Sequence, residues 1–263
     1  IDRMLEKDKN QRIASARAVG AELEAIMQGR DTPSHPLREL EPATPTPTPT
    51  TAAKHNLPAQ TTPFVGREHE IAEVLRLLDT SRLITIIAPG GMGKTRLALE
   101  VGARHALPLH EAAFPNGVYF VELAPLTSAD FIVSTIADAL GFQFYQGGEP
   151  KQQLLDFLRE KSLLLLMDNF EHLLAGVNIV SDILQAAPQV KVIATSRERL
   201  NLSGETLFTL SGMDFPAWET PEDALNYAAV KLFMQSALRV RPDFELTAND
   251  LAYVARICRL VDG

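Results

Sequence analysis

The sequence predicts an α/β fold in which a parallel sheet is flanked by helices and is followed by the start of an all-helical domain. Three observations carry this prediction. From Phe64 onward, short apolar runs of strand length alternate with amphipathic helical stretches. A glycine-rich turn joins the first strand to the helix that follows it. After Pro216 the pattern becomes helical only.

Composition divides the 263 residues into four segments. Residues 1–30 carry apolar side chains at helical spacing, which predicts a short helical segment. Residues 31–57, in which Thr and Pro alternate over 44–50, are predicted to be a disordered linker, with a Pro-rich docking motif as the alternative. The α/β domain is assigned to residues 58–216 and the start of the helical domain to 217–263. The chain begins with Ile and stops within a helical pattern, so we expect a segment of a longer polypeptide.

The elements follow from apolar periodicity. Strands are expected over residues 82–89, 117–123, 162–168, 190–196 and 205–210. Helices are expected over residues 67–79, 94–105, 128–142, 151–160, 172–187, 221–240 and 247–261. Because parallel strands need crossover connections, helices are expected on both faces of the sheet.

Composition also limits the partners. The net charge of -8 argues against direct nucleic-acid binding by this segment, which would need clustered Lys and Arg. The longest apolar runs are far shorter than a membrane span, so no membrane association is expected. The single Cys258 fits a reducing, cytoplasmic setting. The six His residues form no cluster with metal-ligand spacing.

The stretch ITIIAPGGMGKTRLALEV, residues 84–101, nearly matches the phosphate-loop pattern G-x-x-x-x-G-K-[ST]. Ala88 occupies the place of the first glycine. That place lies at the end of a strand, where the backbone can stay in the β region and Ala is tolerated. The loop is therefore predicted to bind phosphate. The candidate nucleotide-binding residues are Ala88, Pro89, Gly90, Gly91, Met92, Gly93, Lys94, Thr95 and Arg96.

Within this loop, the backbone N–H groups and the start of the following helix would face the phosphates. Lys94 is predicted to contact the β- and γ-phosphates and to face solvent when the loop is empty. The Thr95 hydroxyl is predicted to be a ligand of Mg²⁺.

An apolar strand that ends in Asp168 has the Walker B arrangement, in which a carboxylate holds Mg²⁺ through its water. The next residue is Asn169, where rapid ATPases usually carry a second acid. Glu171 is the nearest replacement as a catalytic residue, and a solvated acid at a helix start is the equal alternative. The sequence therefore does not predict fast hydrolysis.

Thr195, Ser196 and Arg197 follow the fourth predicted strand. At the carboxyl edge of a parallel sheet they would lie beside the phosphate loop. A cation there can sense a γ-phosphate, so Arg197 is the third candidate catalytic residue.

These motifs resemble those of STAND-class, NB-ARC-like regulatory P-loop ATPases, over residues 58–263. The segment PFVGREHEI resembles the motif whose backbone surrounds the adenine, which implies roles for Phe64, Val65, Gly66 and Arg67. Asn169 is typical of bacterial transcription-regulator-like members. The resemblance implies ATP/ADP and Mg²⁺ as ligands, self-association in the ATP state, and effector or signal domains beyond residue 263.

The first 30 residues resemble the last helices of a serine/threonine protein kinase, with an ordinary amphipathic helix pair as the alternative. The catalytic residues of a kinase are absent, so this segment cannot phosphorylate a substrate. The combined interpretation is a bacterial signalling switch with slow ATPase activity. An AAA+ ATPase with continuous turnover and a non-catalytic adaptor are the alternatives.

Overall fold

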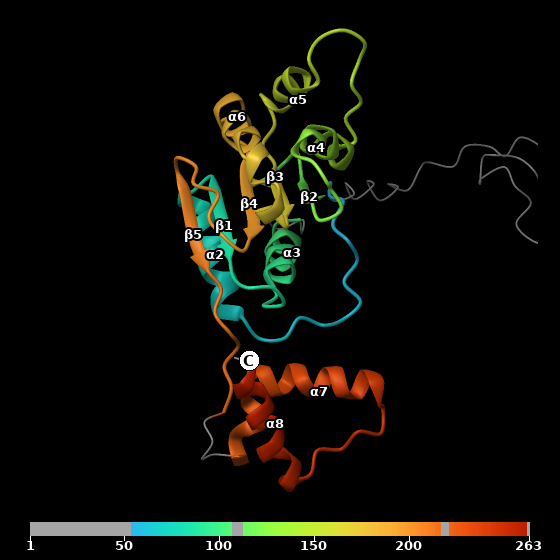
Figure 1. Ribbon diagram of the computed structural model, residues 1–263, viewed down its shortest axis with the longest axis vertical. Coiled ribbons are helices and arrows are strands. Elements are labelled where there is room, and N and C mark those ends of the chain that lie inside the picture. Colours follow the sequence, from blue (N-terminus) through green and yellow to red (C-terminus); the bar gives the residue numbers. More distant parts are fainter. Residues whose placement is uncertain (1–53, 107–112, 217–220, 262–263) are drawn as a thin grey trace, which may run out of the picture. The chain divides into compact units, whose positions relative to one another are not determined.

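The computed structural model describes residues 54–106, 113–216 and 221–261, and the predicted kinase-like helices and most of the predicted linker lie outside them. Its centre is a five-stranded sheet in the order β2-β3-β4-β1-β5 (Figure 1). All four neighbouring pairs run parallel, as predicted. The strands are β1 (Leu83–Ile87), β2 (Val118–Glu122), β3 (Leu164–Asp168), β4 (Lys191–Ser196) and β5 (Glu205–Thr209).

Helices cover both faces of this sheet. One hydrophobic cluster joins the sheet to α2 (Glu68–Thr80) and α3 (Lys94–His105). A second cluster joins the opposite face to α4 (Ile132–Leu140), α5 (Pro150–Leu158) and α6 (Asn178–Ala186). Strands β1, β3 and β4 contribute alternate side chains to the two clusters because successive residues of a strand point to opposite faces. The expected three-layer α/β architecture is confirmed.

The strand order determines which motifs meet. Strand β4 lies between β1, which leads into the phosphate loop, and β3, which ends at Asp168. All carboxyl ends of the parallel strands lie at one edge of the sheet, so residues after β4 lie between the other two motifs. The fold therefore places Arg197 between Lys94 and Asp168.

Three predicted helices are shorter than expected, and each begins with 3₁₀ turns. The helix predicted over 128–142 starts as a 3₁₀ turn, Ala129–Phe131, and becomes α-helical only in α4. The helix predicted over 172–187 begins only at Asn178, after two 3₁₀ turns, Phe170–His172 and Leu174–Gly176. Gly176 packs so tightly that an added Cβ would lie 2.7 Å from Ala129 Cβ. The helix predicted over 221–240 likewise begins with a 3₁₀ segment, Pro221–Asn226, before α7 (Ala228–Val240).

The helical segment continues with α8 (Ala248–Leu260), which begins at Thr247 in a capping box with Asp250. A small hydrophobic cluster that includes Val230, Val254 and Cys258 joins α7 to α8. The described part of the chain after residue 220 is thus helical, as the sequence predicts.

The end of the predicted linker is held against the edge strand β2. His55 forms a parallel bridge with Val118. The Asn56 side chain accepts a hydrogen bond from Phe120 N and donates one to Phe120 O, at 2.6 and 2.9 Å. Residues 54–56 are thus part of the folded domain, which begins before the predicted boundary at residue 57.

Among the described residues, no helix is both long and apolar enough to cross a membrane.

Candidate nucleotide-binding site

The phosphate loop has the backbone conformation that its glycines allow. Gly91 and Gly93 have φ of 83° and 86°, and Gly93 precedes the first residue of α3. A Cβ at either position would meet nothing within 4 Å, so glycine is needed there for its conformation and not for space. Among the described residues, positive φ at non-glycine positions occurs only at Arg67, Asn169 and Asn201. Ala88 is thus free of this strain, which explains why it can replace the first glycine.

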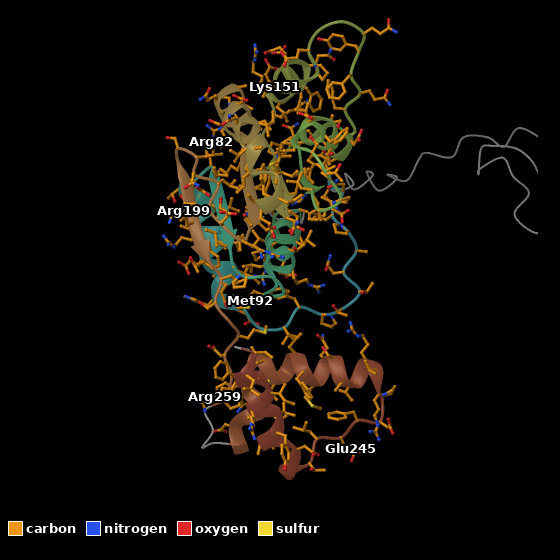
Figure 2. The ribbon with its side chains drawn as sticks, in the orientation of Figure 1. Arg82, Met92, Lys151, Arg199, Glu245 and Arg259 are labelled. Atoms are coloured by element: carbon orange, nitrogen blue, oxygen red, sulfur yellow. The ribbon has the colours of Figure 1, made fainter. Side chains whose placement is uncertain are left out.

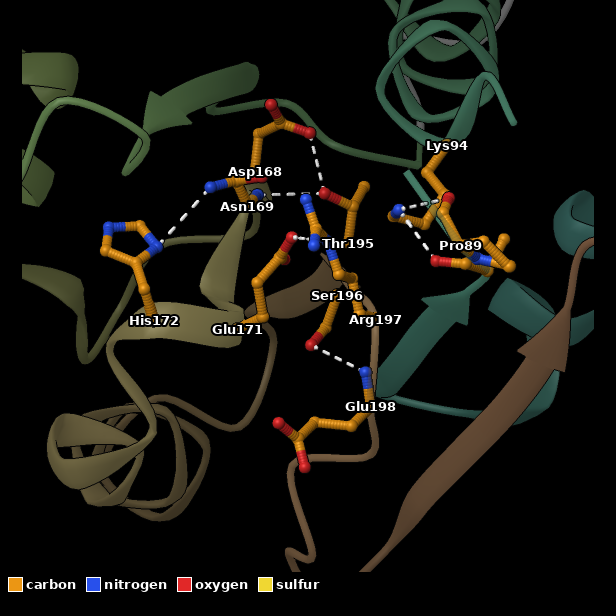
Figure 3. Close-up of polar contacts among 11 residues, drawn as sticks. Pro89, Lys94, Asp168, Asn169, Glu171, His172, Thr195, Ser196, Arg197 and Glu198 are labelled. Atoms are coloured by element: carbon orange, nitrogen blue, oxygen red, sulfur yellow. Dashed lines mark hydrogen bonds and ion pairs between the residues drawn. The ribbon is translucent and has the colours of Figure 1, made fainter. Parts of the chain in front are cut away.

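Lys94 lies inside the loop. Its side chain is buried, and its Nζ donates hydrogen bonds to the carbonyl oxygens of Ala88 and Pro89 at 2.8 and 3.1 Å (Figure 3). The expectation of a solvent-facing lysine is therefore wrong, because the loop carbonyls bind the ammonium group. Burial lowers the pKa of Lys94. The negative charges of Glu171 and Asp168 oppose that shift, and the positive charge of Arg197 adds to it.

Asp168 is held by its neighbour in the sheet. The Thr195 hydroxyl donates to Asp168 Oδ1 at 2.6 Å and accepts from Asn169 N at 2.9 Å. Both Asp168 and Thr195 are buried. The orientation of this carboxylate at the end of β3 is therefore fixed by one hydroxyl at the end of β4.

Glu171 points into the site and not into solvent. Its Oε1 pairs with Arg197 Nε at 3.0 Å, and its side chain is only 14% exposed (Figure 3). Its second oxygen, Oε2, is buried and has no hydrogen-bond partner. Arg197 also lies against the phosphate loop, since a Cβ added at Gly90 would be 3.4 Å from Arg197 Nη2. Glu171 is thus not a solvated acid at a helix start, and its position supports the alternative of a residue that acts in the site.

Asn169 adopts a left-handed conformation with φ of 68°. Its side-chain nitrogen is 3.3 Å from His172 Nδ1, and His172 Nε2 is 3.0 Å from Leu126 O. The carbonyl of Leu126 can only accept, so His172 carries its proton on Nε2 and accepts from Asn169 at Nδ1. The turn after β3 is thereby fixed to the loop after β2.

An apolar cavity of about 450 Å³ lies beside the loop. Its walls come from the Phe64 loop (residues 62–67), from the tip of the phosphate loop at Met92 (Figure 2), and from the helical segment. The lining residues are Thr62, Pro63, Phe64, Val65, Arg67, Gly90, Gly91, Met92, Gly93, Arg96, Met213, Leu232, Gln235 and Val261. This volume and an apolar lining with few polar groups are typical of a small-molecule site.

Two arginines fix the Phe64 loop to the phosphate loop. Arg67 Nη2 donates to Met92 O at 3.2 Å, and its Nη1 pairs with Glu70 at 3.1 Å. Arg96 bonds to Thr62 O and to the side chain of Gln60, and its guanidinium lies 5.9 Å from the centre of the Phe64 ring.

Gly66 is the one member of the predicted adenine motif that does not line the cavity. It has φ of 67°, and an added Cβ would lie 2.7 Å from Ala228 Cβ. The Phe64 loop and α7 thus approach closely at Gly66, which fits a packing role.

The residues present fit a magnesium nucleotide. The loop offers an amide-lined turn with open space at Gly91 and Gly93, and a buried lysine. Thr95 is exposed at the second position of α3. In the described part of the chain, no group of three or more His, Cys, Asp or Glu residues is placed to hold a metal ion. Mg²⁺ is usually held by one or two protein oxygens together with phosphates and water, and Thr95 and Asp168 are the candidate oxygens here.

Sequence reasoning missed the far wall of the cavity. Met213 follows β5, and Leu232, Gln235 and Val261 lie in the helical segment. None of them belongs to a motif, and only tertiary packing brings them to the Phe64 loop. It also missed the hydrogen bond that Thr195 makes to Asp168, although both strand ends were identified.

A phosphate loop, a strand-end aspartate and a parallel sheet in this order define a P-loop ATPase. Residues 76–214, more than half of the chain, match the model of the AAA domain family. The chain belongs to this AAA domain family, whose members bind nucleotide.

Curated relatives come from mycobacteria. The uncharacterized protein Rv0894 of Mycobacterium tuberculosis is 35% identical over 213 residues, which cover 81% of this chain and 50% of that protein. Rv0890c of the same strain, provisionally named an HTH-type transcriptional regulator, is 35% identical over 188 residues, covering 71% of this chain and 19% of the relative. The chain thus spans half or less of the length of these relatives.

Solved structures resemble the chain more distantly. A STAND protein with a tetratricopeptide repeat sensor from Pyrococcus horikoshii has 18% identity and a TM-score of 0.47, covering 81% of this chain and 30% of that one. The ORC2 protein of Aeropyrum pernix has 14% identity and a TM-score of 0.49, covering 76% and 70%. At these identities and TM-scores, neither structure carries an argument about function.

Proposed function

We propose that this chain is the nucleotide-operated switch of a larger bacterial signalling protein, a STAND-class ATPase that binds ATP and ADP with Mg²⁺ and hydrolyses ATP slowly. In this proposal the phosphate loop holds the phosphates, and Lys94 exchanges its loop carbonyls for phosphate oxygens. Thr95 and Asp168 hold the metal, which supplies charge neutralisation between the phosphates. The cavity beside Phe64 takes the adenine.

The observation that carries the proposal is the position of Arg197. Its guanidinium lies against Gly90 of the phosphate loop. Arg197 directly follows β4, which lies between β1 and β3, the strands that lead to the phosphate loop and to Asp168. A guanidinium in that position can form charge-assisted hydrogen bonds with a third phosphate. ADP lacks that phosphate, so Arg197 provides a difference in binding energy between the two nucleotides. Such a difference is what a two-state switch requires.

Slow hydrolysis is supported by the turn after β3. The residue next to Asp168 is Asn169, whose side-chain nitrogen is directed to His172 (Figure 3). An amide cannot take a proton from water as a carboxylate can. The remaining acid, Glu171, is engaged with Arg197. The position next to Asp168 therefore offers no general base.

The cavity supplies the second half of the switch. It is lined both by the α/β domain and by Leu232, Gln235 and Val261 of the helical segment. A nucleotide in it would contact both parts. We expect ADP to hold them together and ATP to loosen them, which would permit self-association and action on effector domains outside this chain.

The setting of the switch is also part of the proposal. The provisional name of Rv0890c supports a link to transcription regulation, without direct nucleic-acid binding by this segment. A cytoplasmic location and a preceding protein kinase domain complete the proposed protein.

The test is a titration of the purified chain with ATP and ADP in the presence of Mg²⁺, combined with steady-state phosphate release. We expect both nucleotides to bind and turnover to stay below about 0.1 per second, against a median of about 10 per second for enzymes. Rapid continuous turnover would favour an AAA+ motor instead. Failure to bind any adenine nucleotide would favour a non-catalytic adaptor and overturn the proposal.

A further inference from the structure

The ion pair between Glu171 and Arg197 joins a largely buried carboxylate to a largely exposed guanidinium. The Glu171 side chain is 14% exposed and follows directly from the fixed turn at Asn169 and Phe170, of which Phe170 is fully buried. The Arg197 side chain is 66% exposed. If the pair breaks, Arg197 is therefore the partner that moves.

We propose that Glu171 competes with the γ-phosphate of ATP for Arg197, and so lowers the preference of the site for ATP over ADP. The inference rests on the proposed function, because it assigns a regulator to the same nucleotide site. Glu171 holds the guanidinium through Nε, while Nη2 faces Gly90 of the phosphate loop. A γ-phosphate at the loop would draw the guanidinium toward Gly90 and away from Glu171 Oε1, so the two anions compete for one cation.

The strength of the pair sets the size of the effect. Ion pairs with a solvent-exposed partner are weak, so the pair is formed in most molecules but opens readily. The apparent affinity for ATP is then reduced by the fraction of molecules in which Arg197 is free. For a pair of ordinary strength this amounts to a reduction of about three- to sixfold. ADP, which has no third phosphate, does not compete.

Glu171 is suited to this task because Arg197 is its only ion-pair partner among the described residues. Its Oε2 is buried without a hydrogen-bond partner. The other charged groups that act on this corner are Lys94 and Asp168, and Lys94 is already bonded to the loop carbonyls. Glu171 therefore returns to Arg197 whenever the third phosphate is absent.

The experiment is a double-mutant cycle on the whole chain, with ATP and ADP affinities measured by calorimetry. Glu171→Gln keeps the shape of the side chain and removes its charge. We expect it to raise ATP affinity about three- to sixfold more than ADP affinity. In an Arg197→Ala background, the same change should leave the ratio of ATP to ADP affinity unaltered. The cycle isolates the competition from the general effect of removing a negative charge.

Glu198→Gln is the matched control. Glu198 is adjacent to Arg197 in the chain and exposed, and its carboxylate points away from the guanidinium (Figure 3). Its removal changes net charge equally but should not change the ratio. Should Glu171→Gln unfold, Glu171→Asp shortens the reach while keeping the charge, and it should raise the ratio in the same direction.

The outcomes separate the two proposals. Binding of both nucleotides, with the same effect of Glu171→Gln in both backgrounds, would overturn the competition and leave the switch intact. Loss of all nucleotide binding by the unmodified chain would overturn both.

Discussion

The polar side and the apolar side of the candidate site differ in how they are held. On the polar side, Asp168 and Thr195 lie at the ends of the neighbouring strands β3 and β4, and Lys94 lies at the start of α3. Hydrogen bonds fix each of the three side chains. On the apolar side, the cavity is closed by α7 and by Val261 just beyond α8, which lie outside the sheet. The polar side is therefore suited to recognise phosphates. The shape of the apolar side depends on the position of the helical segment.

The largest effect is expected on the polar side. Lys94→Ala should abolish Mg·ATP and Mg·ADP binding, a loss of more than about 100-fold, because the charge-assisted contacts to phosphate disappear. Since Lys94 Nζ also bonds Ala88 O and Pro89 O, a small loss of thermal stability should accompany it. Calorimetry and thermal unfolding measure the two effects. Lys231→Ala, an exposed lysine on α7, is the control and should change neither. Retained nucleotide affinity in folded Lys94→Ala would remove the phosphate-loop assignment.

Thr195→Val should cost about 1–3 kcal/mol of unfolding free energy, because it leaves Asp168 Oδ1 and Asn169 N without their buried partner. Thr85→Val is the matched control. Thr85 is fully buried on β1, next to β4, and its hydroxyl has no hydrogen-bond partner. That substitution should be neutral or stabilising in the same denaturant titration. Equal costs for the two variants would show that the Thr195 bonds contribute nothing specific.

On the apolar side, Gly66→Ala should reduce stability by about 1–3 kcal/mol, because it strains a left-handed backbone. Its Cβ would also contact Ala228, so the helical segment should shift and both nucleotides should bind less well by the same factor. Gly204→Ala is the control, with φ of 77° and open space around the added Cβ. It should show the strain without the loss of nucleotide affinity. A selective loss of ATP in Gly66→Ala would contradict the division between the two sides.

The contrast also explains what the sequence could predict. The phosphate loop, Asp168 and Arg197 were identified because each follows an apolar strand, and the sheet brings strand ends together whatever the side chains are. The burial of Lys94 was not foreseen, since it depends on carbonyl groups that no residue type reveals. The helix predicted from residue 172 begins only at Asn178. The close packing of Gly176 against Ala129, 47 residues earlier in the chain, is a tertiary contact that local periodicity does not reveal. The far wall of the cavity was missed because Leu232 is an ordinary apolar residue of an amphipathic helix and Val261 directly follows the end of another.

Arg197 decides whether the polar side distinguishes the two nucleotides or only binds them. If its guanidinium contacts the third phosphate, Arg197→Ala should weaken ATP by about 1.5–3 kcal/mol, the range for hydrogen bonds to charged groups, and leave ADP nearly unchanged. The exposed Arg199, two residues further along, provides the control substitution.

The most direct measurement is therefore a paired calorimetric titration of the unmodified chain and Arg197→Ala with Mg·ATP and Mg·ADP. A loss confined to ATP is the predicted result, and it gives the free energy available to drive the switch. Equal losses for ATP and ADP would make Arg197 a structural residue and contradict the account.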